Sequence, residues 1–213
     1  MADFFMNCMS KKFSNAIQSL NEGSGVMDIA GGSGHVSLAL SLMGIQSTIM
    51  DPRESVGKLP MRDRKAFRKA KRNYEQQGQQ CIPVIPPPLP FAMKRAWFLQ
   101  KPQGVDSTYR ENDTVLPVCG ICDPLLSNCS AIIALHPDEA TESIVDFAIQ
   151  FKIPFVIVPC CVFSRLFPMR IWKGLTVTKY EDFIDYLLSK HKSIQKSKLD
   201  FEGSNIALWS LFL

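Results

Sequence analysis

The stretch Val26-Met-Asp-Ile-Ala-Gly-Gly-Ser-Gly-His35 decides the fold of this chain. An apolar segment ends at Asp28 and breaks into a glycine-rich turn, a helical apolar run follows, and a second apolar segment, 47–50, ends at Asp51. Strand, tight turn, helix and strand form one half of a nucleotide-binding sheet. The glycines let the backbone turn sharply and approach a ligand closely. The pattern therefore predicts a nucleoside pocket at this turn, with Asp51 placed to accept hydrogen bonds from ribose hydroxyls.

The rest of the chain repeats the alternation of apolar strands and helices. Apolar patterns predict strands over 26–30, 47–50, 131–135 and 155–158, and helices over 12–21, 34–44, 61–77, 138–151 and 181–190. The C-terminal stretch 199–212 reads as a hairpin. These elements predict an α/β fold, a Rossmann-like doubly wound and mostly parallel sheet with an antiparallel hairpin strand. We expect a single domain over 1–213, with an irregular basic and proline-rich insertion at about 54–118.

Bulk composition favours a soluble globular protein. Hydrophobic residues make up 46% of the chain and charged residues 21%, which are ordinary shares for such a protein. The longest apolar run, 153–163, holds two prolines and is too short to span a bilayer. The sequence shows no charged leader before an apolar stretch, and its seven cysteines then favour reduced thiols. We expect a cytoplasmic or nuclear location.

Positive charge is concentrated in one predicted helix. The chain carries a net charge of +4, and segment 62–72 alone holds seven basic residues: Arg62, Arg64, Lys65, Arg68, Lys69, Lys71 and Arg72. A second basic and aromatic patch spans 94–101, with Lys94, Arg95, Trp97, Phe98 and Lys101. Cations for phosphates and aromatic rings for stacking predict contact with RNA. A solvated helix face is the alternative for the first segment.

The glycine spacing separates two classes of cofactor. Dinucleotide sites use G-x-G-x-x-G, whereas this turn has the acid first, as D-x-A-x-G-x-G. This resembles the first motif of class I S-adenosylmethionine-dependent methyltransferases, with Ala30 where many members have glycine. Their cofactor has no phosphate and is cationic, which suits an acid beside the turn. A dinucleotide site and a purely structural turn remain the alternatives.

The resemblance implies S-adenosyl-L-methionine as cofactor and a set of residues around it. Asp28 and the turn at 32–34 would lie under the methionine part, Asp51 would bind the ribose, and Asp123 would meet the adenine amino group. The full implied set is Asp28, Ala30, Gly31, Gly32, Ser33, Gly34, Asp51, Pro52, Asp123 and His136.

Two later segments follow predicted strands and should meet at the same sheet edge. They read Leu135-His-Pro-Asp-Glu-Ala-Thr-Glu142 and Val158-Pro-Cys-Cys-Val-Phe163. They resemble a methyltransferase branch with an L-H-x-C-G-x-x-T-D segment and a later P-C-C, which includes a tRNA ribose methyltransferase family. This chain departs from that branch with Asp138-Glu139 in place of C-G, and it lacks the zinc-finger modules of the tRNA-modifying members. The shared segments span about 24–53 and 130–167.

These segments supply the catalytic candidates. His136 could act as general base, with Asp138 beside it, and Cys160 or Cys161 could act as a nucleophile. The alternatives are a histidine that organises the loop, a helix cap at Asp138, and buried free thiols. We expect no metal site, because the chain has one C-x-x-C pair and adjacent cysteines point to opposite sides of an extended chain.

The sequence thus predicts an S-adenosylmethionine-dependent methyltransferase with RNA as the acceptor. A protein or small-molecule acceptor is one alternative. A methyltransferase-like fold that serves as a binding or assembly subunit without turnover is another.

Overall fold

The computed structural model describes residues 1–76, 91–98, 117–118 and 123–213. The proline run of 81–90, Lys101 and the Cys119/Cys122 pair lie outside the described residues. Within the described part of the chain, no helix has the length and apolar character needed to cross a membrane.

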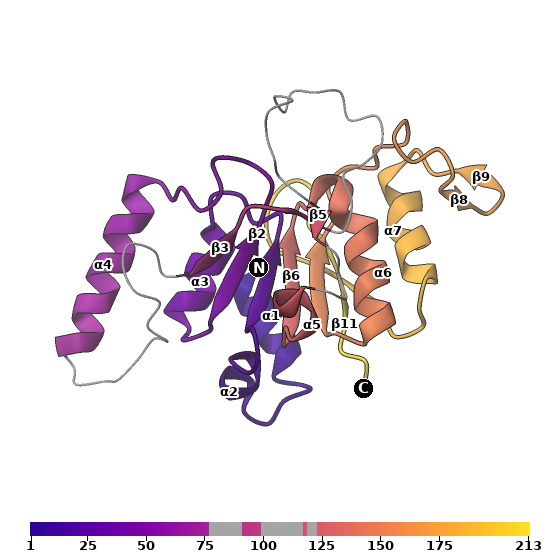
Figure 1. Ribbon diagram of the computed structural model, residues 1–213. Coiled ribbons are helices and arrows are strands. Elements are labelled where there is room, and N and C mark those ends of the chain that lie inside the picture. The colour runs from indigo at the N-terminus through magenta and orange to yellow at the C-terminus, as the bar shows by residue number, and fades with distance from the viewer. Residues whose placement is uncertain (77–90, 99–116, 119–122) are drawn as a thin grey trace.

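A seven-stranded sheet forms the centre of the molecule (Figure 1). Its strands are β1 (Val26–Ile29), β2 (Ser47–Met50), β3 (Ala92–Lys94), β6 (Ala131–Leu135), β7 (Phe155–Val158), β10 (Gln195–Lys198) and β11 (Ile206–Ser210). The spatial order is β10-β11-β7-β6-β1-β2-β3. The neighbouring pairs β3–β2, β2–β1, β1–β6 and β6–β7 are parallel. Strand β11 is antiparallel to both β7 and β10. One reversed strand is therefore inserted near the end of an otherwise parallel sheet.

Helices cover both faces of this sheet. One face packs against α1 (Ala2–Met9), α2 (Ala16–Leu20) and α3 (His35–Leu42), and the other against α5 (Pro124–Ser127), α6 (Thr141–Phe151) and α7 (Tyr180–Ser189). Alternate residues of each strand serve the two layers: in β7, Val156 and Val158 face the first and Phe155 and Ile157 the second. Burial on both faces explains why β6 and β7 are continuously apolar.

A long basic helix, α4 (Met61–Gln76), projects from one end of the sheet (Figure 1). Its Phe67 packs against a small cluster built on Leu38, Ile49, Leu59 and Phe91. Short pieces complete the described structure: the pair β4 (Trp97–Phe98) and β5 (Pro117–Val118), the hairpin β8 (Ile171–Trp172) and β9 (Leu175–Thr176), and a 3-10 turn at Asp138–Ala140.

The strand–helix alternation predicted from the sequence is confirmed, and its errors are at the sheet edges. The hairpin begins with β10 at 195–198, not at 199, and β3 lies inside the stretch we predicted as an irregular insertion. Both are edge strands with a face open to solvent, so they lack a continuous apolar run. The helix predicted over 12–21 forms only as α2.

Candidate functional site

The sheet has a topological switch point between β1 and β6. From β1 the chain adds β2 and β3 on one side and then crosses over to add β6 and β7 on the other. In doubly wound sheets ligands bind beyond the carboxyl ends of the strands at such a point. Four loops gather at this edge, following β1, β2, β6 and β7. They carry every residue expected at the cofactor site except Asp28, which lies within β1, and Asp123, which precedes α5.

The turn after β1 requires its glycines. Ala30, Gly32 and Gly34 have φ values of 55°, 55° and 94°, in the left-handed region that costs a residue with a Cβ more than glycine. A Cβ on Gly34 would lie 2.4 Å from Cζ of Phe91, and one on Gly31 would lie 2.6 Å from Cγ of Asp28. The backbone of the turn therefore sits directly on the groups beneath it, and the half-buried stretch 30–33 is its accessible surface.

Asp28 lies beneath this turn and is fully buried. Its Oδ2 accepts a hydrogen bond from the Ser37 hydroxyl at 2.7 Å, while its buried Oδ1 has no hydrogen-bond partner among the residues that the structure describes. Burial raises the pKa of Asp28 to about 7, and the nearby charge of Asp51 adds to the rise, whereas the bonds from Ser37 lower it. The carboxyl supports the turn from below and is poised to change charge near neutral pH.

Asp51 ends β2 and ties the second loop to the turn. Its carboxylate accepts from the backbone N–H of Gly32 at 3.0 Å and from that of Arg53 at 2.9 Å. The Arg53 guanidinium donates to both oxygens, at 2.9 and 2.6 Å. A carboxylate has about four lone-pair sites, so all are in use, two by backbone and two by a side chain that is 46% exposed. Two hydroxyls could replace the guanidinium without disturbing the backbone bonds.

Asp123 is held within the chain. Its Oδ1 accepts from the backbone N–H of Leu125 at 2.9 Å as the N-cap of α5, and Oδ2 pairs with Lys94. Asp123 is 7% exposed. Both of its oxygens therefore have partners before any ligand is considered.

His136 follows β6 and its ring turns toward the β10–β11 hairpin. Its Nε2 lies 3.0 Å from the Ser204 carbonyl oxygen. A carbonyl oxygen can only accept, so Nε2 carries the hydrogen and Nδ1 is the basic nitrogen of the neutral ring. Its backbone has φ 55° and donates to the Val158 carbonyl at 2.9 Å. This exposed ring can therefore take up a proton at Nδ1.

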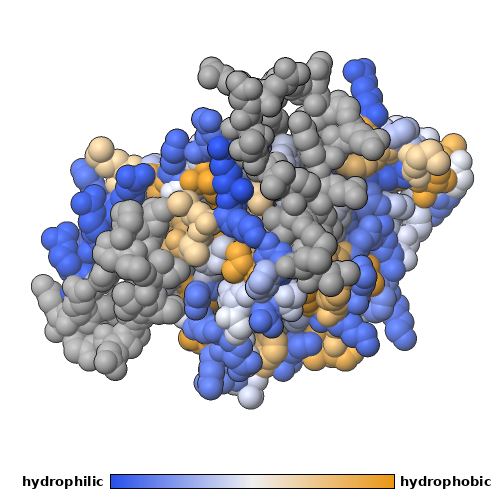
Figure 2. All heavy atoms as spheres, in the orientation of Figure 1, coloured by the Kyte–Doolittle hydropathy of each residue, from blue (hydrophilic) through white to orange (hydrophobic). Residues whose placement is uncertain are grey.

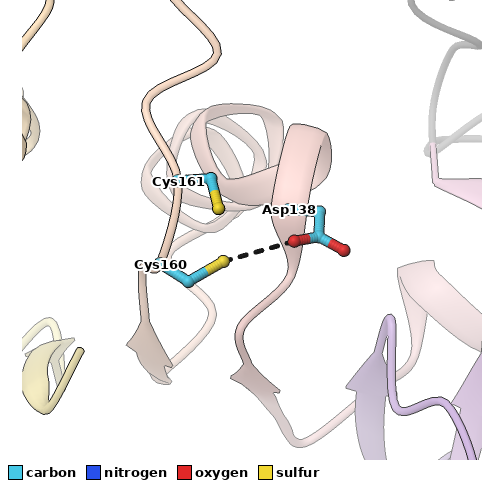
Figure 3. A group of neighbouring side chains, drawn as sticks. All are labelled: Asp138, Cys160 and Cys161. Atoms are coloured by element: carbon cyan, nitrogen blue, oxygen red, sulfur yellow. Dashed lines mark hydrogen bonds between the residues drawn. The ribbon is translucent and has the colours of Figure 1, made fainter. Parts of the chain in front are cut away.

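Asp138, Cys160 and Cys161 converge from the loops after β6 and β7 (Figure 3). The Cys160 thiol donates to Oδ1 of Asp138 at 3.2 Å, so the Asp138 side chain does not cap the following helix. Burial, with added contributions from Asp138 and Cys161, raises the pKa of Cys160 to about 12. The prediction that the two cysteines point apart is wrong, because residues 159–163 are not extended strand.

A buried ionic cluster missed at the sequence level fixes the loop that carries these cysteines. Arg170, 4% exposed, pairs with Glu142 of α6 and donates to the Val162 carbonyl at 2.6 Å. Lys190 and the Tyr186 hydroxyl also bind Glu142. Burial alone would raise the pKa of Glu142, but hydrogen bonds from Lys190, Tyr186 and Arg170 outweigh it and lower the pKa. Sequence reasoning flagged Glu142 only as a motif position, because its partners are distant in sequence.

The two segments expected to bind RNA, 62–72 and 94–101, differ in how far their side chains are exposed. The α4 side chains of Arg62, Arg64, Lys65, Arg68, Lys69 and Arg72 are exposed, and Figure 2 shows a hydrophilic surface over the end of the molecule where α4 lies. In the 94–101 patch, Phe98 is 6% exposed against Phe147, and Lys94 is paired with Asp123. Phe98 is therefore not accessible for stacking on a base, and contact of the 94–101 patch with RNA stays a prediction.

Comparisons with known proteins place the chain beside methyltransferases of solved structure. No family model matches the sequence, and no curated protein matches it significantly. Similar structures include magnesium protoporphyrin IX methyltransferase from Synechocystis PCC 6803 with bound SAH, at 12% identity and TM-score 0.46, covering 98% of this chain and 82% of that one. Others are a SAM-dependent methyltransferase from Methanosarcina mazei (12%, TM-score 0.37, 90% and 93% covered) and an rRNA methylase from Streptococcus thermophilus (12%, TM-score 0.35, 99% and 94% covered).

Similarity this low says nothing of what this chain binds. The class of the fold is therefore assigned from the strand order of the chain itself. Six parallel strands with one reversed strand, β11, inserted between β7 and the edge strand β10, and a glycine turn at the switch point, define the class I methyltransferase fold.

Proposed function

We propose that this protein is a methyltransferase that binds S-adenosyl-L-methionine at the switch point. The observation that carries the proposal is Asp51, a buried carboxylate bonded to the turn at Gly32 and covered on its other side by one exposed guanidinium. The two hydrogen bonds from that guanidinium match the two hydroxyls of a ribose. The glycines of the turn let the backbone approach a ligand closely. The site offers carboxylates and not a phosphate-binding loop, which suits a cationic nucleoside without phosphate.

Catalysis in such a site is chiefly a matter of positioning. The cofactor, when bound, supplies a methyl group on a sulfonium ion. Asp51 and the backbone of 30–34 hold the nucleoside at the sheet edge, and Asp28 supports that backbone with a carboxyl that can become negative. His136, exposed on a neighbouring loop, can accept the acceptor's proton at Nδ1.

Calorimetry with S-adenosyl-L-methionine tests this proposal through two neighbouring substitutions. Asp51→Asn removes the charge that accepts from both hydroxyls, and we expect its dissociation constant to rise about 100-fold, since each bond to a charged group contributes about 1.5 kcal/mol. Arg53→Ala removes the group that competes for the same oxygens, and we expect binding as tight as the wild type or tighter.

Thermal unfolding without ligand controls for damage to the turn in either variant. No heat of binding by the wild-type protein, or equal affinity in Asp51→Asn, would reject the cofactor assignment.

We further propose that RNA is the acceptor, with α4 as its docking helix. Six exposed Arg and Lys side chains lie on this helix, and only Asp63 offsets them in segment 62–72. Asp63 is itself 3.0 Å from His35 at the start of α3, so α4 is joined to the helix that follows the glycine turn. Phosphates bound along α4 would bring an RNA strand beside the proposed cofactor site.

The triple variant Lys65→Ala/Arg68→Ala/Lys69→Ala is expected to bind single-stranded RNA more weakly and with a smaller salt dependence. Loss of three phosphate contacts lowers the slope of log affinity against log salt by about 2. The control is the triple variant Lys179→Ala/Lys192→Ala/Lys198→Ala, which removes the same charge. Its three lysines are exposed and lie toward the β10 end of the sheet, opposite to the β3 end. Equal losses in the two triples, read by fluorescence anisotropy at several salt concentrations, would favour a protein or small-molecule acceptor.

A further inference from the structure

Two thiols and a carboxylate meet at the edge of the sheet. One ligand atom each from Asp138, Cys160 and Cys161 lies within 4.8 Å of the other two. Figure 3 shows both sulfur atoms and the carboxylate directed toward a common space between the loops after β6 and β7. Leu135 and Val158, which end these two strands, are paired in the parallel ladder. The register of the sheet therefore brings the two loops, and these three side chains, together.

The geometry fits a small thiophilic ion. Zinc binds thiolate sulfur at about 2.3 Å and carboxylate oxygen at about 2.0–2.2 Å in tetrahedral geometry, which places a sulfur and an oxygen ligand about 3.5–3.7 Å apart and two sulfur ligands about 3.8 Å apart. The Cys160 Sγ to Asp138 Oδ1 distance is 3.2 Å. A metal at the centre would need only a slight opening of this pair, and it would replace the thiol proton that now joins them.

The loops that carry these groups are fixed from several directions. The Tyr180 hydroxyl donates to the Pro159 carbonyl at 3.2 Å, and Arg170 holds the Val162 carbonyl. Asp138 has φ 49°, which turns its side chain away from the helix start and toward Cys160. A non-glycine residue in this conformation costs about 1–3 kcal/mol, and such strain gathers where it serves a function. The three ligands are thus held in place before any ion binds.

We propose that Asp138, Cys160 and Cys161 bind one Zn²⁺ or a similarly thiophilic divalent ion, with the fourth coordination position open. Two thiolates and one carboxylate supply three negative charges for the ion, and the two thiol protons leave to solvent. Three protein ligands and an open position are typical of catalytic rather than structural zinc sites. The site lies on the same sheet edge as the glycine turn, where an open position would face an incoming ligand. This replaces the sequence-based expectation of no metal site.

Cobalt titration of the reduced, metal-free protein under argon tests the proposal, because Co²⁺ bound to thiolates gives a near-ultraviolet charge-transfer band and tetrahedral Co²⁺ gives visible bands. We expect saturation at one ion per chain and loss of the bands when Zn²⁺ is added. Cys160→Ser and Cys161→Ser should each weaken binding at least about tenfold and reduce the charge-transfer band, whereas Asp138→Asn should weaken binding and keep the band.

The C-x-x-C pair provides the control, since Cys119→Ser/Cys122→Ser should titrate like the wild type. A wild type without thiolate bands, or bands that disappear in the Cys119→Ser/Cys122→Ser variant and persist in Cys160→Ser/Cys161→Ser, would overturn the site. Thermal unfolding gives a second readout: Zn²⁺ should raise the midpoint of the wild type, raise that of Asp138→Asn less, and leave that of Cys160→Ser/Cys161→Ser unchanged. None of these measurements involves S-adenosyl-L-methionine, so they stand apart from the proposed methyl transfer.

Discussion

Replacing Arg170 by methionine is expected to lower the free energy of unfolding by about 3 kcal/mol. Arg170 is 4% exposed and its guanidinium lies 3.7 Å from the ring centroid of Phe167. Its loss leaves the Val162 carbonyl without its 2.6 Å partner and Glu142 without one of its three cations and donors. Breaking a buried pair by removing one partner typically costs about 3–5 kcal/mol. Methionine retains most of the aliphatic volume beside the Phe167 ring, so the lost free energy comes mainly from the polar contacts.

Urea denaturation at neutral pH measures this cost against a matched exposed pair. Lys196 lies 3.7 Å from Asp185, and the two side chains are 57% and 45% exposed, so Lys196→Met should cost less than about 1 kcal/mol. The same loss of free energy in both variants would show that the Glu142 cluster is not a stability element.

Acid should reduce the cost of Arg170→Met. The cluster lowers the pKa of Glu142 below its usual 4.5, so its contribution is present above that value and is lost as the pH falls through the depressed pKa. The loop from β7 to Arg170 carries both cysteines of the proposed metal site, so this cluster also fixes their position.

The sequence was sufficient to predict the centre of the sheet and the glycine turn at its edge, because both are local patterns. Strands buried on two faces need mostly apolar side chains. A turn whose residues have positive φ values favours glycine. Those constraints located 26–34, 47–51 and 131–138 from residue types alone. Edge strands carry no such constraint, so Gln195–Lys198, all polar, was missed.

Pairings between side chains could not be predicted. Nothing in the sequence around Asp51 indicates that Arg53 occupies all its remaining lone pairs, since that depends on the backbone bending at Pro52. The approach of Asp138 to Cys160 depends on the register of β6 and β7 and on the positive φ of Asp138. Their spacing in the sequence offered a helix cap as the alternative to a catalytic role for Asp138, and it indicated separated thiols for Cys160 and Cys161.

Between about pH 4 and pH 7 the wild-type protein is expected to lose stability that the Asp28→Asn variant keeps. Asp28 is fully buried and its pKa rises from 3.8 to about 7 in the folded protein. An acid with a raised folded pKa retains its proton in the native state after the unfolded state has lost its own, so stability falls as pH rises through this window. A shift of about 3 units corresponds to at most ~4 kcal/mol.

Urea unfolding of both proteins across this range measures the difference. Asparagine has nearly the same shape, can accept from Ser37 and does not titrate, so the two proteins should be similar near pH 4 and diverge up to about pH 7, above which Asp28→Asn is the more stable by a constant amount. Parallel pH profiles would show that Asp28 is ionised in the native state throughout.

The same ionisation should couple to the proposed cofactor. A sulfonium ion above the turn favours the charged form of Asp28, so wild-type affinity for S-adenosyl-L-methionine should rise between pH 6 and pH 8 as binding releases the carboxyl proton. S-adenosylhomocysteine lacks the sulfonium charge and should show a smaller rise. In the Asp28→Asn variant the affinities for the two ligands should have the same pH dependence, because no proton remains to be released at that position. A pH dependence that is equal for both ligands in the wild type would place the sulfonium away from Asp28, leaving the ribose contact at Asp51 as the anchor of the cofactor.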